Sequence, residues 1–110
     1  MLFRVYLVAA WCALVAFTGV VMAAHGGNLF PVFFGDIAAG GWPGQFNADF
    51  MTLLGLSGLW CGWRGKWTPL ALVHALAAFI GGGVVVMATL LVLHVRHRGD
   101  MRKVLLGAQA

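Results

Sequence analysis

The stretch VYLVAAWCALVAFTGVVMAA, from Val5 to Ala24, decides the fold class of this chain. It carries no charged residue, and as an α-helix its twenty residues rise roughly 30 Å, which is the thickness of the hydrocarbon core of a bilayer. A secretory signal peptide is the alternative, with Arg4 as its basic region and Ala23 and Ala24 at its cleavage site. We expect a retained membrane helix over residues 5–24.

The composition of the whole chain also indicates a membrane protein. Hydrophobic residues make up 62% of the 110 residues and charged residues 9%, whereas soluble domains carry roughly 25% charged residues. The length predicts a single domain, 1–110. Four of the seven basic residues lie in the tail 96–110, which we interpret as a solvated flank, with contact to anionic lipid head groups as the alternative. No folded basic face for nucleic acid is predicted.

Two further apolar segments follow the first. The second covers residues 47–63, where Asn47 is a plausible N-cap and Asp49 suits the positive end of the helix dipole. Asp49 therefore marks a polar boundary of this helix, and its alternative role is a polar contact to a partner. The third segment covers residues 68–95 and is expected to be one tilted helix, because it is longer than a bilayer core. It opens with Thr68 as N-cap and Pro69 at the first helical position.

The connection at residues 25–46 is rich in glycine but also in apolar side chains. It predicts a short helix over residues 30–39 lying in the membrane interface, with a re-entrant loop as the alternative. Aromatic and basic residues are typical of membrane boundaries. The residues that we assign to such boundaries are Trp42, Trp60, Trp63, Arg64, Arg96 and Arg98.

Small residues form a second pattern on the later helices. Such residues let helices approach closely in lipid, either within one chain or against another subunit. Gly58 and Gly62 form a GxxxG pair. The full set of predicted packing or partner-interface residues is Gly55, Gly58, Gly62, Ala71, Ala75, Ala78 and Gly82.

His74 is the one candidate cofactor ligand. An ionisable residue inside a membrane helix is costly and often functional. Its neutral imidazole can ligate a haem iron or the magnesium of a chlorophyll-type pigment. The alternative is a neutral histidine hydrogen-bonded to a neighbouring helix. Cys12 and Cys61 are interpreted as small hydrophobic residues, and no metal site is predicted.

The order of these features resembles a family of small three-helix membrane proteins of bacteria and cyanobacteria whose function is unknown. The resemblance covers most of the chain, although the connection at residues 65–67 is shorter and less charged than is typical of the family. It implies the three-helix architecture and no activity. The matching features are Leu29–Phe30, Phe33–Phe34, Phe46–Asp49, the Trp60 to Arg64 exit, and Thr68–Leu70.

The sequence holds no nucleophile–base pair, phosphate-binding loop or paired carboxylates, so no enzyme is predicted. We expect an all-α protein of three transmembrane helices, with its termini on opposite sides of a bacterial inner membrane and a cytoplasmic N-terminus. The leading interpretation is an accessory subunit of a larger membrane complex, energy-transducing or photosynthetic. The alternatives are a pigment- or haem-binding protein using His74, and a small homo-oligomeric transporter or channel. The expected partners are membrane lipid and other subunits or further copies of the chain.

Overall fold

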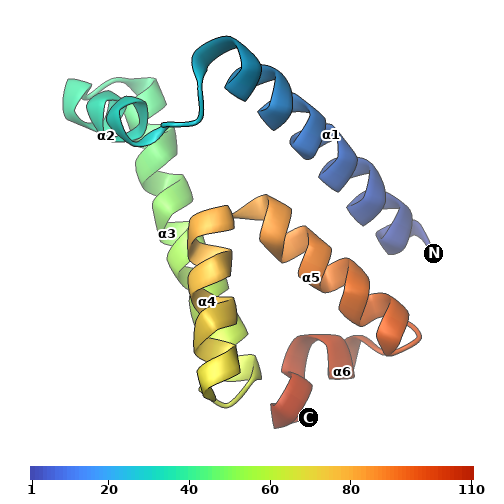
Figure 1. Ribbon diagram of the computed structural model, residues 1–110. Coiled ribbons are helices and arrows are strands. Elements are labelled where there is room, and N and C mark those ends of the chain that lie inside the picture. Colours follow the sequence, from blue (N-terminus) through green and yellow to red (C-terminus); the bar gives the residue numbers. More distant parts are fainter.

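The computed structural model describes all residues, 1–110, and confirms an all-α fold without strands (Figure 1). A short 3-10 turn, Gly107–Gln109, ends the chain. The helices are α1 (Leu2–His25), α2 (Phe30–Ala39), α3 (Trp42–Arg64), α4 (Pro69–Gly81), α5 (Gly83–Arg96) and α6 (Met101–Leu106).

The helices form two pairs that diverge like the arms of a wedge (Figure 1). In one arm α3 and α4 make an antiparallel hairpin; in the other, α1 runs alongside α5 in the opposite direction. The short helix α2 packs on α3, and α6 lies between the lower ends of the two arms. The molecule is therefore open, with extents of 43 × 28 × 22 Å and eleven buried residues of 110.

The expectation of one continuous third helix over residues 68–95 is wrong. The helix breaks at Gly82, whose φ of 59° and ψ of −134° lie in a region that only glycine adopts readily. The break turns the chain back, so that α4 and α5 have 13 and 14 residues. Each rises about 20 Å, too little to cross a hydrocarbon core of about 30 Å. The predicted start is confirmed, since Thr68 accepts a hydrogen bond from the backbone of Ala71 at 3.2 Å.

The second predicted helix begins earlier than residue 47. α3 begins at Trp42 with Gly41 as N-cap and a proline in its first turn, where a missing N–H costs nothing. Asn47 is therefore no N-cap: its side-chain amide donates to the carbonyl oxygen of Phe33 at 3.1 Å and ties α3 to α2. The buried Gly44 allows this contact, because a Cβ there would collide with the backbone of α2.

The other predicted helices agree more closely with the structure. The helix expected over residues 30–39 is confirmed as α2, and the first apolar segment extends a few residues beyond 5–24 at its start. The basic tail 96–110 contains α6.

By length and hydropathy together, α1 is the one helix that meets the usual criteria for a membrane span. α3 is also long enough, but Gln45, Asn47 and Asp49 make its first turns polar. The two termini lie at the same end of the molecule, because the start of α1 contacts the end of α5: Arg4 Nε donates to His94 Nδ1 at 3.3 Å. The expectation of termini on opposite sides of a membrane rested on an uninterrupted third helix, which the structure lacks; the sides themselves stay a prediction.

Candidate functional site

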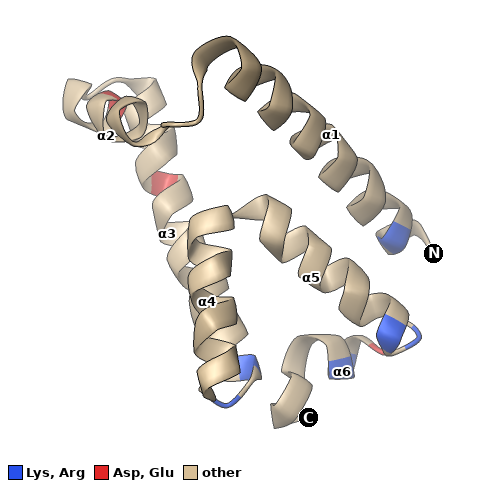
Figure 2. Ribbon diagram, in the orientation of Figure 1, with Lys and Arg blue, Asp and Glu red and all other residues tan.

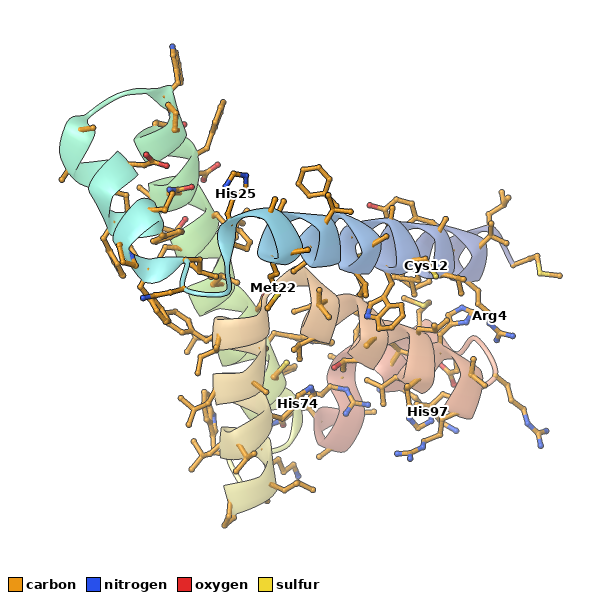
Figure 3. All side chains as sticks on the ribbon, turned by 45° about the horizontal axis from the view of Figure 1, so that its top comes forward. Arg4, Cys12, Met22, His25, His74 and His97 are labelled. Atoms are coloured by element: carbon orange, nitrogen blue, oxygen red, sulfur yellow. The ribbon has the colours of Figure 1, made fainter.

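A groove of about 590 Å³ lies between α4 and α5, where the wedge is open, and reaches α1. Its wall is mostly apolar, and its polar side chains come mainly from α3, α4 and α5. Figure 3 places His74 on the side of α4 that faces α5. The lining residues are Trp11, Arg64, Leu70, His74, Val84, Val85, Ala88, Thr89, Val92, Leu93 and Arg96.

His74 joins the two legs of the broken helix. Its Nε2 lies 2.9 Å from Thr89 Oγ1, in a hydrogen bond between α4 and α5. Cys61 Sγ of α3 lies 3.8 Å from the same nitrogen. A metal bound at this nitrogen would have to displace Thr89, and no cluster of three histidine, cysteine or acidic residues supplies further ligands. Ligation of a pigment or haem by His74 stays a prediction.

Arg64 occupies the lower end of the groove, where it is fixed by α6. Its Nε donates to the carbonyl oxygen of Val104 at 2.7 Å, and its Nη2 donates to that of Lys103 at 3.2 Å. Arg96 also lines the groove, and arginine stays protonated in proteins. The groove thus ends in two positive charges.

The predicted small-residue faces meet each other within this chain. Gly58, Ala71 and Ala78 are buried where α3 packs on α4. A Cβ at Gly58 would lie 3.2 Å from the carbonyl oxygen of Ala75, so that glycine sets the approach of the two backbones. These residues build the hairpin, which leaves less of the pattern free to bind another subunit.

The remaining small residues have different surroundings. A Cβ at Gly62 would collide with the ring of Trp67, so Gly62 accommodates the turn between α3 and α4. A Cβ at Gly82 would lie 3.0 Å from Phe50 of α3, and the break is therefore packed as well as bent. Gly55 has open space around its Cα. It is the member of the predicted set that remains available for another chain.

Charge divides the molecule into two ends (Figure 2). Asp36 and Asp49 lie on α2 and on the upper part of α3, and Trp42 is exposed there at the start of α3. The N-terminal start of α1 and the lower end of the molecule, to which Trp60 and Trp63 belong, hold every lysine and arginine, together with Asp100 between α5 and α6. The seven basic residues are Arg4, Arg64, Lys66, Arg96, Arg98, Arg102 and Lys103.

Three contacts that shape the site were not expected from the sequence. Trp11 Nε1 donates to the carbonyl oxygen of Val84 at 3.0 Å and holds α1 against α5. Thr89 is the partner of His74 on α5, and the Arg4–His94 bond joins residues 90 positions apart. A helix that is apolar on all sides can pack by any face, so the hydrophobic pattern of the sequence does not predict which residues of two helices will meet.

A search of known families, of curated proteins and of solved structures finds no match to this chain. The resemblance to a three-helix family of unknown function therefore stays a prediction.

Proposed function

We propose that this protein is a non-enzymatic subunit of a larger membrane assembly. The observation that carries the proposal is the small interior of the folded chain, in which eleven of 110 residues are buried. Both arms carry large exposed apolar side chains, such as Phe17 (69% exposed), Ile80 (76%) and Leu70 (79%). Lipid covers such a surface, but the sparse contact between the two arms favours a partner chain that holds them.

The break at Gly82 supports a particular arrangement in the membrane. We propose that α1 and α3 cross it and that α4 and α5 form a re-entrant hairpin, entering and leaving on one side. Irregular backbone at membrane depth is tolerated only where protein surrounds it, and Gly82 is packed against Phe50. The long dimension of 43 Å is comparable to a bilayer with its head groups. The basic end would then face the cytoplasm, because positively charged flanks are retained there.

A pigment- or haem-binding protein is the second candidate, favoured by the position of His74 on an open groove. Its test is direct. A purified protein with a visible absorption band that Thr89→Val leaves intact and His74→Ala abolishes would support it, and a colourless protein would refute it. A homo-oligomeric transporter is less favoured, because the groove wall is mostly apolar and a conducting pore requires a wettable lining.

Native mass spectrometry after gentle extraction from the source membrane tests the subunit proposal. We expect an assembly much heavier than 11.7 kDa that contains other chains. A mass of one copy, or a simple multiple of it, would contradict the proposal and favour a self-assembling protein. Gly55→Leu is the matched variant, because it changes the free small-residue face without a contact inside the chain. Loss of partner chains with unchanged helix content would locate the interface there.

A further inference from the structure

We propose that the groove between α4 and α5 binds an anionic phospholipid, with the lipid phosphate at Arg64 and Arg96 and one acyl chain along the wall of α5. The proposal rests on the membrane location proposed above. It adds a binding site that a structural subunit does not require.

The lower end of the groove has the chemistry of a phosphate site. Arg64 and Arg96 both line it, and neither has a carboxylate among its neighbours in the groove. Asp36 and Asp49 lie at the other end of the molecule, and Asp100 accepts hydrogen bonds from the backbone of Arg102 and Lys103. Two guanidinium groups beside one another without a counter-ion repel, and an anion bound between them removes that repulsion. Guanidinium groups are also well shaped for phosphate oxygens.

The position of Arg64 is fixed before any ligand arrives. Its bonds to the carbonyl oxygens of Val104 and Lys103 use Nε and Nη2, which leaves the Nη1 protons without a partner in the protein. The side chain therefore loses little conformational entropy on binding an anion. Arg96 is exposed and can turn toward the same anion.

The groove above the arginines has the shape and surface of an acyl-chain site. Its α5 wall runs from Val84 to Arg96, thirteen residues whose Cα atoms rise about 18 Å as a helix. One leaflet of the hydrocarbon core is about 15 Å thick, half of the whole core. Val85, Ala88 and Val92 supply an apolar surface along that length. The match of length and polarity favours a membrane lipid over a free phosphate or a soluble peptide.

Native mass spectrometry of the purified full chain in detergent tests this site. The protein is incubated with phosphatidylglycerol or with phosphatidylcholine of the same acyl chains, and the lipid adducts are compared. We expect the wild-type protein to retain phosphatidylglycerol at least about five-fold more strongly, since a basic residue near the surface contributes on that scale. Equal retention of the two lipids would overturn the proposal.

Two arginine variants separate a defined site from diffuse attraction. Arg96→Gln removes a groove residue, and Arg98→Gln removes the same charge outside the groove. We expect Arg96→Gln to weaken phosphatidylglycerol retention about five-fold and Arg98→Gln to leave it unchanged. Equal effects of the two variants would overturn the proposal, because a general positive potential would then explain the binding.

The acyl-chain part has its own test. Ala88→Phe fills the groove wall and should reduce retention of both lipids, with helix content measured by circular dichroism to confirm folding. Displacement of phosphatidylglycerol by millimolar inorganic phosphate would show an anion site without a lipid chain and would also overturn the proposal. These measurements use the isolated chain, so they remain decisive if native membranes yield no partner subunit.

Discussion

His74 Nε2 and Thr89 Oγ1 lie 2.9 Å apart and form the one side-chain hydrogen bond between α4 and α5. The bond spans the break at Gly82, whose own backbone geometry turns the chain. The imidazole of His74 is thereby hydrogen-bonded within its own chain. The arrangement of α4 and α5 is held by this bond, by packing of Gly82 on α3, and by the hydrogen bond from Trp11 to Val84.

Thr89→Val should weaken the contact between α4 and α5. It removes the hydroxyl but keeps the shape of the side chain, and hydrogen bonds between membrane helices contribute about 0.6 kcal/mol on average and at most about 1.7 kcal/mol. We expect a loss of that size in the free energy of unfolding measured in detergent. Thr18→Val is the control, because Thr18 donates only to Leu14 within α1. Equal losses in the two variants would argue against a link between α4 and α5.

Both termini should be on the cytoplasmic side of the membrane. The contact of Arg4 with His94 joins the start of α1 to the end of α5, and every basic residue lies at that end. Reporter domains fused to either terminus, active only on one side of the membrane, measure this directly. A C-terminus on the far side with a cytoplasmic N-terminus would restore three full crossings and refute the re-entrant arrangement.

Gly58→Leu should open the hairpin of α3 and α4, whereas Gly55→Leu should not. A Cβ at Gly58 would lie 3.2 Å from the carbonyl oxygen of Ala75, and one at Gly55 meets nothing within 4 Å. Overpacking of this kind costs about 1–3 kcal/mol. Unfolding of the two variants in detergent, compared with wild type, measures the difference. A larger loss for Gly55→Leu would show that the packing is assigned to the wrong face of α3.

Trp60→Phe should loosen the contact of α6 with α3. The indole Nε1 of Trp60 donates to the carbonyl oxygen of Leu105 at 2.9 Å, and the bond is lost with the indole. Trp63→Phe is the matched control, since no hydrogen bond of its indole is found. Hydrogen exchange of the α6 amides should become about five-fold faster in Trp60→Phe alone, as expected for one bond of about 1 kcal/mol. Unchanged exchange would mean that Arg64 alone fixes α6.

Local signals predicted the helix boundaries that depend on nearby residues. Thr68 followed by Pro69 predicts the start of a helix, because the threonine side chain caps the first turn, and the structure confirms this cap. The short helix at residues 30–39 was predicted from the apolar side chains of the connection, which are unsuited to a loop in water. Asn47 misled the prediction of α3, because a good capping residue also makes a good tertiary donor, here to Phe33.

The break at Gly82 and the groove could not be predicted by the same means. Apolar residues continue in phase through Gly81–Gly83, and glycine is frequent in membrane helices, so the pattern favoured one long helix. Three consecutive glycines lower helix propensity, but the direction of the turn depends on contacts with Phe50 and Leu54 of another helix. The groove depends in turn on that direction.

The turn at Gly82 also has a consequence for the way this chain is made. Residues 69–93 leave the ribosome as an apolar run long enough for the insertion machinery to treat as a crossing segment. The glycine at position 82 then decides whether this run turns back or crosses the membrane. Gly82→Leu should straighten the run and carry the C-terminal tail, with its four cations, to the opposite side. The terminal reporters would detect that inversion, and an unmoved C-terminus would show that the packing on α3, rather than the glycine, directs the chain during synthesis.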